Sequence, residues 1–229
     1  MVGDKIKILT VLKKEHDWLK HSNKHTIYTP DHVYKIRDMC KKHIKLNYEF
    51  LCLTDFPNLD CNTIPLQYNL NGWWSKFELF KIKGPVFYLD LDTIIINNID
   101  SIIKQFINYN FSCFCRKPSK DLWTTVMGWN ADVSSIYNYF KKINLIDILS
   151  NNNSNKILRG DQDLLFYITK HINLDINYIK SSSKKNGIVT YRSLFGKHST
   201  GVPSYKWQNN KIIIFTGIPR PWEQNNILY

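Results

Sequence analysis

The sequence lacks any long apolar run, and no stretch approaches the roughly 20 residues that a membrane-spanning helix needs. Its N-terminal segment, MVGDKIKILTVLKKEH, is interrupted by lysines and has no small-residue cleavage site. We therefore expect this segment to be a first strand of the fold and not a secretory signal. The expected protein has no membrane span and is cytoplasmic, or lies in the host cytoplasm if its source is viral.

The cysteines are too scattered for a disulfide framework or a zinc site. The five cysteines are an odd number, so they cannot all be paired. No CxxC pair occurs in the sequence, so no cysteine pair completes a zinc site. The sequence therefore favours reduced, buried thiols, as in an intracellular protein.

The charge of the chain is strongly positive, with 31 Lys and Arg residues against 19 Asp and Glu and a formal net charge of +12. Such a balance favours a polyanionic partner, which could be a nucleic acid, an anionic surface or a phosphate-bearing small molecule. The positive residues are scattered and form no tail or stripe, so ordinary surface lysine in a Lys-, Asn- and Ile-rich chain is an equal alternative.

The order of the expected elements predicts an α/β fold in one domain. A strand over 5–12 is followed by a helix that begins at Thr29-Pro30-Asp31, with an N-cap threonine and a proline in the first turn. A second strand follows over 48–54, so the unit is a βαβ crossover with parallel strands. The 229 residues contain no internal repeat and no convincing linker.

The rest of the chain continues this alternation of strands and helices. The apolar spacing predicts helices over 73–82, 99–109, 133–143 and 161–171, and strands over 86–89, 111–115, 126–129 and 212–215. The strand over 86–89, VFYL, is apolar throughout, which is typical of a central strand covered on both faces.

The strand over 86–89 runs directly into Asp90-Leu91-Asp92-Thr93. In open α/β sheets, ligands bind beyond the carboxyl ends of the strands. Two carboxylates placed there repel each other unless a cation lies between or beside them, and Mg²⁺ or Mn²⁺ can do this and also hold a diphosphate. The alternative is a solvated turn in which the acidic residues cap the next element.

A phosphatase of the haloacid-dehalogenase type would also place Asp-x-Asp after a buried strand, with the first aspartate as nucleophile. That pattern expects the Thr two residues after the second aspartate, whereas Thr93 follows Asp92 immediately. No later lysine and acidic pair completes the phosphatase pattern, so we rank this interpretation below nucleotide binding.

Five motifs in one order resemble a known family of transferases. They are GWWSKFELF at 72–80, FYLDLDT at 87–93, VMGWN at 126–130, GDQD at 160–163 and FTGIPRPW at 215–222. Together they resemble GT-A-fold glycosyltransferases of the glycogenin and lipopolysaccharide-galactosyltransferase family (family 8), and still more the small bacterial proteins with the pattern GWWSK…YLDLDT…GDQ…FHGxPxPW. The resemblance covers nearly the whole chain.

This resemblance implies a fold and two functional halves. The fold would be a single GT-A-like domain over 1–229, Rossmann-like, with a mostly parallel central sheet flanked by helices. Its nucleotide-binding half would span about 1–95 and its sugar and acceptor half about 96–229. The acceptor side would be built from the least family-like segments, 150–155 and 181–203.

The resemblance also implies roles for individual residues. Asp90 and Asp92 would bind Mn²⁺ or Mg²⁺ and the donor diphosphate, and Asp161 and Gln162 would be the catalytic pair facing the transferred sugar. The further donor-binding residues would be Thr10, Val11, Asp55, Lys76, Leu91, Asn130, Arg192, Gly217 and Arg220.

The sequence departs from the family in the late motif that supplies a metal-binding histidine. Here the segment reads Ile214-Phe215-Thr216-Gly217, without histidine. Two carboxylates, diphosphate oxygens and water could still complete a coordination sphere of six. We expect weaker binding of the metal, and an inactive descendant of the family stays an open alternative.

The expected activity is transfer of a hexose from a nucleotide-diphosphate donor, a UDP-sugar, to a glycan or protein acceptor that the sequence does not identify. Members of the family retain the anomeric configuration, which the resemblance extends to this chain. Two other hypotheses stay open, a catalytically impaired protein that binds nucleotide sugars or glycans, and a basic nucleic-acid-binding protein.

Overall fold

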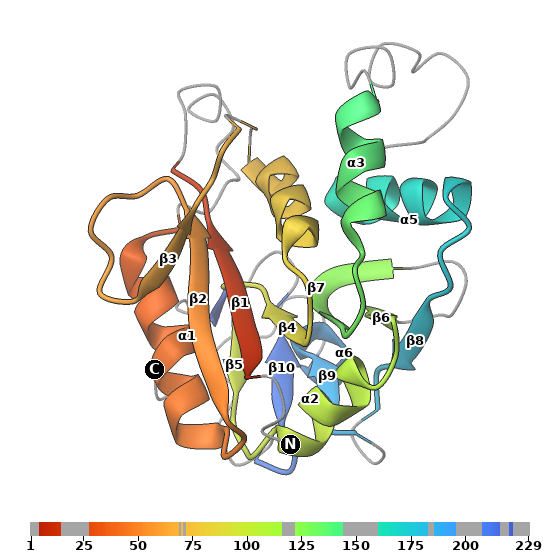
Figure 1. The fold of residues 1–229 in the computed structure, drawn as a ribbon. Helices are drawn as coiled ribbons and strands as arrows, with labels where there is room; N and C mark the ends of the chain where they lie inside the picture. Colours follow the sequence, from red (N-terminus) through yellow and green to blue (C-terminus); the bar gives the residue numbers. More distant parts are fainter. Residues whose placement is uncertain are drawn as a thin grey trace.

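A large mixed sheet carries the fold in the computed structural model, which describes residues 5–14, 28–68, 70, 72–115, 122–143, 160–182, 186–195, 208–215 and 220–221. Within these residues the sheet has seven strands in the order β3-β2-β1-β4-β7-β6-β8 (Figure 1). The strands are β1 (Ile6–Leu12), β2 (Tyr48–Thr54), β3 (Asn62–Pro65), β4 (Val86–Leu89), β6 (Phe111–Cys115), β7 (Leu122–Trp129) and β8 (Asn177–Lys180).

The first half of the sheet is the parallel unit that the sequence predicts. β1 pairs in parallel with β2 on one side and with β4 on the other. The connection from β1 to β2 contains α1 (Pro30–His43), whose first turn is fixed by a reciprocal cap between Thr29 and His32. Lysines and a histidine end α1, where the negative end of the helix dipole favours positive charge.

The second half of the sheet is built around β7, which is antiparallel to both β4 and β6. A smaller sheet has the order β5-β10-β9 among the described residues, with β5 (Thr93–Ile95), β9 (Ile188–Thr190) and β10 (Ile212–Ile214). Because β10 pairs with β5, it brings the chain back to the segment that follows Asp92.

Helices cover both faces of the large sheet (Figure 1). One apolar core lies under α1 and α2 (Asp100–Ile107), and it includes Phe87 and Phe106. The other lies under η2 (Gly72–Lys81), α3 (Ser134–Lys142) and α5 (Asp161–His171), where Phe77 stacks on Phe140 with ring centroids 4.4 Å apart. The predicted α/β class, with a mostly parallel sheet flanked by helices, is confirmed. No helix in the described ranges is both long enough and apolar enough to cross a membrane.

Several elements differ from those predicted. The segment expected as an α-helix over 73–82 is a 3₁₀ helix, and β7 begins at Leu122 and not at Val126. The sequence analysis missed β3, β5, β8, β9 and α6 (Tyr191–Phe195). These are elements of three to five residues, too short to show a hydrophobic period, and β3 and β8 also lie at the edges of the sheet, where few of their residues are buried.

The stacked pair of Phe77 and Phe140 gives a test of the core under η2. Phe77 is 1% exposed, so Phe77→Ala removes a buried ring and leaves a cavity. We expect a loss of about 3–5 kcal/mol in the free energy of unfolding, measured by urea denaturation. The matched control is Tyr109→Ala, because Tyr109 is 49% exposed and should be nearly neutral. Equal losses in the two variants would contradict this packing.

Candidate functional site

A cavity of about 340 Å³ lies beyond the carboxyl ends of β1 and β4. Residues from widely separated parts of the chain line it, which is the arrangement expected at this edge of an open α/β sheet. They are Val11, Lys13, Lys14, Tyr28, Gly72, Trp73, Ser75, Lys76, Tyr88, Asp90, Leu91, Asp92, Thr125, Asp161, Gln162, Phe215 and Arg220.

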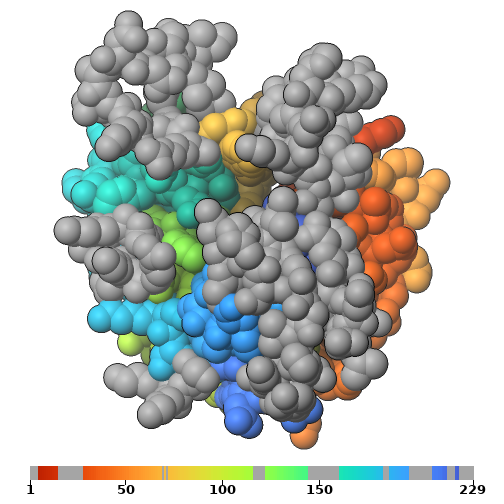
Figure 2. All heavy atoms as spheres, turned by 180° about the vertical axis from the view of Figure 1, so that it is seen from behind, coloured from red at the N-terminus to blue at the C-terminus, as the bar shows by residue number. Residues whose placement is uncertain are grey.

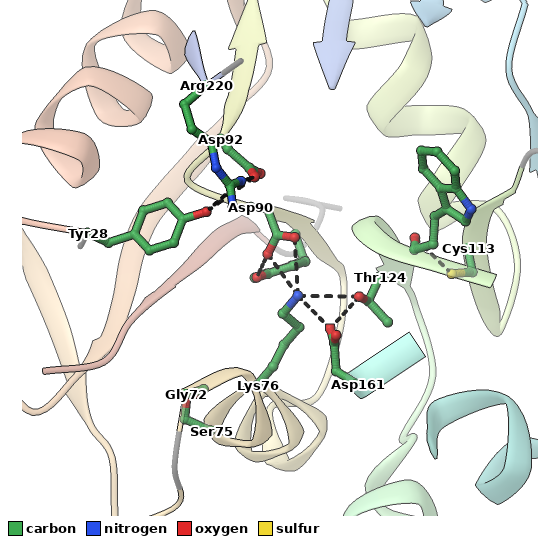
Figure 3. Close-up of polar contacts among 12 residues, drawn as sticks. Tyr28, Gly72, Ser75, Lys76, Asp90, Asp92, Cys113, Thr124, Asp161 and Arg220 are labelled. Atoms are coloured by element: carbon green, nitrogen blue, oxygen red, sulfur yellow. Dashed lines mark hydrogen bonds and ion pairs between the residues drawn. The ribbon is translucent and has the colours of Figure 1, made fainter. Parts of the chain in front are cut away.

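Asp90 is held at the end of β4 by both its backbone and its carboxylate. Its backbone N–H donates to the carbonyl oxygen of Thr125, 2.9 Å away, and the hydroxyl of Tyr88 donates to its Oδ1. Burial, and then the negative charge of Asp90, raises the pKa of Tyr88 well above its ordinary value, so Tyr88 keeps its proton. The Asp90 carboxylate therefore lies at the wall of the cavity with a fixed orientation (Figure 3).

Lys76 bridges two carboxylates that come from different elements. Its Nζ lies 2.9 Å from Oδ1 of Asp90 and 2.7 Å from Oδ2 of Asp161, and the hydroxyl of Thr124 donates to the same Asp161 oxygen (Figure 3). Burial alone would lower the pKa of Lys76, but the two carboxylates outweigh it and raise this pKa above its ordinary value. Lys76 is therefore a permanent cation that ties α5 to the end of β4.

The start of η2 sets the position of Lys76. Gly72 has a positive φ of 51°, a conformation that glycine adopts at little cost, and the hydroxyl of Ser75 donates to the carbonyl oxygen of Gly72 over 2.8 Å. This closed turn directs the side chain of the next residue, Lys76, into the carboxylate cluster (Figure 3).

Asp92 has a separate pair of partners. Its Oδ2 accepts a hydrogen bond from the hydroxyl of Tyr28 over 3.2 Å and forms an ion pair with Arg220, which also donates to Tyr28 (Figure 3). Its Oδ1 is buried and has no hydrogen-bond partner among the described residues. Burial, and then the charge of Asp90, raises the pKa of Asp92 to about 7, and Arg220 opposes that rise.

The residues present fit a divalent cation. Asp90 and Asp92 offer carboxylate oxygens, the ligands that Mg²⁺ and Mn²⁺ prefer, and the buried Oδ1 of Asp92 lacks a partner in the described chain. No group of three or more His, Cys, Asp or Glu side chains suited to a metal occurs in the part of the chain that is described. An ion at this place would therefore need further ligands from a bound diphosphate or water.

Asp55 contributes indirectly, through two lysines that the sequence analysis did not identify. It follows β2, and its Oδ2 lies 2.5 Å from Nζ of Lys13 while its Oδ1 accepts the backbone N–H of Lys14 over 2.6 Å. Both lysines line the cavity, whereas Asp55 does not. Asp55 therefore positions the end of β1, and its contact with a donor stays a prediction.

The structure brings most of the predicted site residues to one place. Val11, Lys76, Asp90, Leu91, Asp92, Asp161, Gln162 and Arg220 all line the cavity. Thr10 is adjacent but fully buried in β1, and its hydroxyl has no hydrogen-bond partner in the described ranges. Arg192 is the second residue of α6 and does not line the cavity. Gly217 lies outside the described residues.

Asn130 is a correction to the predicted site. It is exposed and follows Trp129, which pairs with Val86 at the amino end of β4. Because β7 is antiparallel to β4, Asn130 lies at the opposite edge of the sheet from Asp90. The predicted donor contact has no support in this position.

The sequence analysis missed the hydroxyl groups that hold the carboxylates. Tyr28 comes from the segment before α1, Tyr88 is a core residue of β4, and Thr124 belongs to β7. Their neighbours in sequence give no sign of this role. Lys13 and Lys14, which line the cavity, were also missed. For these two a signal was available, because the doubled lysine directly follows the apolar strand β1, and ligands bind beyond the carboxyl ends of strands in open α/β sheets.

Comparisons with known proteins are informative at the level of the fold. No protein-family model matches the chain, and no curated protein matches it in sequence. The solved structure of the glycosyltransferase GlyE from Streptococcus pneumoniae aligns over 97% of this chain with a TM-score of 0.57 and 12% identity. The chain spans 57% of the GlyE chain. An active-site mutant of LgtC aligns over 97% of this chain and 91% of its own, with a TM-score of 0.52 and 10% identity. This likeness establishes a GT-A-type glycosyltransferase fold.

The bridge made by Lys76 predicts a large effect on stability. Lys76→Met removes the cation and leaves the carboxylates of Asp90 and Asp161 facing each other, partly buried. We expect a loss of about 3–5 kcal/mol in the free energy of unfolding, measured by urea denaturation at neutral pH. The control is Lys83→Met, because Lys83 pairs with Asp132 on the exposed surface. A loss no larger than that of the control would contradict the bridge.

Proposed function

We propose that this protein is a metal-dependent glycosyltransferase that moves a hexose from a nucleotide-diphosphate donor, a UDP-sugar, to an acceptor hydroxyl. The observation that carries the proposal is the convergence of Asp90 and Asp92 from the end of β4 with Asp161 and Gln162 from α5, in one cavity of a GT-A-type fold. The order of its motifs also supports a place among family 8 enzymes.

The charge balance of the cavity supports a donor diphosphate that binds together with a divalent ion. Four cationic side chains and three carboxylates line the cavity, and the carboxylates crowd the end of β4. The two phosphates of a donor would add more negative charge than the one surplus cation offsets. A divalent cation restores the balance, and Asp90 and Asp92 would hold it. When bound, Mn²⁺ or Mg²⁺ supplies positive charge that stabilises the departing diphosphate.

Arg220 and Lys76 are the residues of the chain suited to the leaving group. Their charged groups lie at the carboxylate cluster, Arg220 on Asp92 and Lys76 between Asp90 and Asp161. Negative charge develops on the diphosphate as its bond to the sugar breaks, and fixed cations next to that position lower the barrier. Val11 and Leu91 would line the nucleotide side of the cavity, with Thr10 behind them.

The environment of Asp161 supports retention of the anomeric configuration. An inverting transfer needs a carboxylate that removes the proton of the acceptor. The Oδ2 oxygen of Asp161 faces Lys76 at 2.7 Å and also accepts the hydroxyl of Thr124, so this oxygen is already engaged. Asp161 and Gln162 would then orient the sugar and stabilise its positive character, while the leaving diphosphate takes the acceptor proton.

A protein that only binds nucleotide sugars is the second candidate. The observation in its favour is that three of the four oxygens of the Asp90 and Asp92 carboxylates already contact Lys76 or Arg220. Two tyrosine hydroxyls donate hydrogen bonds to the same carboxylates. Such internal pairing competes with a metal. Binding without turnover would favour this candidate over the enzyme, and binding to nucleic acid alone would favour neither.

The first test removes the proposed metal ligands. With UDP and Mn²⁺ we expect a higher melting temperature for the wild type, since free ligand at a hundredfold excess over Kd stabilises by about 2.7 kcal/mol. Asp90→Asn and Asp92→Asn should each abolish this shift and the metal-dependent release of sugar from UDP-sugars. Asp132→Asn, an exposed aspartate outside the cavity, is the control. Full activity in either cavity variant would contradict the proposal.

The second test addresses the leaving group. Arg220→Ala should lower kcat for donor hydrolysis by about 10²–10³-fold, the usual effect of removing one group that stabilises a transition-state charge. Arg37→Ala is the matched control, because Arg37 also pairs with two aspartates, Asp38 at 2.9 Å and Asp60 at 3.0 Å, but lies on α1 away from the cavity. Equal rates for the two variants would remove Arg220 from the mechanism.

A further inference from the structure

Thr125 of β7 brings to the cavity a hydroxyl group that the described protein leaves without a partner. Thr125 lines the cavity and is only 5% exposed. Its Oγ1 has no hydrogen-bond partner in the described ranges, and among the described residues with such a buried atom only Asp92 also lines the cavity. Because a buried hydroxyl without a partner costs free energy, native proteins keep few of them, and one in a cavity wall is placed for a ligand.

An irregularity in β7 directs Thr125 toward the cavity. The register between β6 and β7 shifts in the middle of β7. Trp123 and Val126 both pack on the core under α1 and α2, whereas a regular strand would place residues three positions apart on opposite faces. The irregularity therefore puts two consecutive threonines, Thr124 and Thr125, on the other face of the sheet, as bulges next to binding sites do.

The two threonines differ in what their hydroxyls contact. The hydroxyl of Thr124 donates to the carboxylate of Asp161 and lies 3.3 Å from Nζ of Lys76 (Figure 3). Thr125 lies opposite Asp90 in the antiparallel pair of β4 and β7, and its carbonyl oxygen accepts the backbone N–H of Asp90. Opposite residues share a face, with Cβ atoms about 4.5–5.5 Å apart. The Thr125 hydroxyl therefore lies next to Asp90 without a hydrogen bond to it.

The contacts around Asp90 divide the cavity into two sides. On one side Asp92 forms its ion pair with Arg220, and the proposed function places the metal and the diphosphate there. On the other side Lys76 bridges Asp90 to Asp161 (Figure 3). The proposed function assigns this second side to the transferred sugar.

Thr125 faces the second side. Met127, two positions along β7, packs in the core under η2, α3 and α5, so Thr125 points to the same face of the sheet. α5 contacts both β7 and η2, and the view from behind shows α5 and η2 side by side in the upper part of the molecule (Figure 2). The hydroxyl of Thr125 is therefore placed among the elements that would surround the sugar.

We propose that the hydroxyl of Thr125 forms a hydrogen bond with one hydroxyl group of the transferred sugar and so helps to select the donor. A threonine hydroxyl donates one hydrogen bond and accepts others, as a sugar hydroxyl does, so the two groups are complementary. A donor without that sugar hydroxyl would leave Oγ1 of Thr125 buried and unpaired, which is how a site rejects an analogue that lacks a polar group. This inference rests on the proposed glycosyltransferase function and names a residue that determines its donor specificity.

The main variant is Thr125→Val, because valine has nearly the shape of threonine and lacks the hydroxyl, and Thr125→Ser keeps the hydroxyl. The control is Thr190→Val, since Thr190 is also 5% exposed and does not line the cavity, but its Oγ1 accepts the backbone N–H of Ser193 over 3.1 Å. In thermal unfolding, Thr125→Val should keep or raise the melting temperature, while Thr190→Val should lower it. A fall for Thr125→Val as large as that of the control would show that the protein itself already uses the hydroxyl, and would contradict the proposal.

Titration calorimetry with Mn²⁺ would measure the binding of UDP, UDP-glucose, UDP-galactose and analogues of these donors that each lack one sugar hydroxyl. We expect Thr125→Val to weaken binding of the preferred UDP-sugar by about three- to tenfold, the effect of one neutral hydrogen bond, and to leave UDP binding unchanged. Thr125→Ser should lose less, and Thr190→Val nothing. One deoxy analogue should bind equally to the wild type and Thr125→Val, which identifies the sugar hydroxyl.

Equal affinities of the wild type and Thr125→Val for UDP-sugars would overturn the proposal, as would a wild type that binds UDP-sugars no better than UDP. A loss for UDP as large as the loss for UDP-sugars would place the hydroxyl on the metal or the diphosphate, and would overturn it too. The proposed function fails in a different way, since it fails if the wild type binds no nucleotide with Mn²⁺. The proposal for Thr125 fails in a protein that still binds UDP, so the two failures are distinguishable.

Discussion

Three carboxylates at one edge of the sheet, those of Asp90, Asp92 and Asp161, impose the main constraint on this structure. Like charges so close together and partly removed from water are unfavourable unless cations separate them. Lys76 lies between two of them and Arg220 pairs with the third. Because these cations come from η2 and from the last described segment of the chain, compensating the charges also joins distant elements.

The same constraint explains how the fold supports a binding site. β4 is buried along its whole length, so it delivers Asp90 to the carboxyl edge with no freedom to turn away. Tyr28, Tyr88 and Thr124 then use their hydroxyls to fix the carboxylates, and Asp55 does the same for the lysines at the end of β1. The result is a cavity whose charged side chains are held in place before any ligand is present.

The sequence predicted the parts of the fold and site that depend on local pattern. The strands and helices with a clear apolar period, and the Asp-x-Asp after a buried strand, follow from such patterns, and the predicted α/β class is confirmed. Asn130 was wrongly placed because its position depends on β7 running antiparallel to β4, which neither motif nor period reveals. Tyr28 and Thr124 were missed because their contacts join residues 64 and 37 positions apart in sequence.

The most direct test of the account is the position of a metal in a crystal of the protein grown with UDP and MnCl₂. Anomalous scattering from manganese would locate the ion without ambiguity. We expect a peak at about 2.0–2.6 Å from a carboxylate oxygen of Asp92, the range for hard cations with oxygen ligands, with the diphosphate between it and Arg220. A nucleotide bound elsewhere, or a cavity free of both manganese and UDP at saturating concentrations, would contradict the claim that this carboxylate cluster is a donor site.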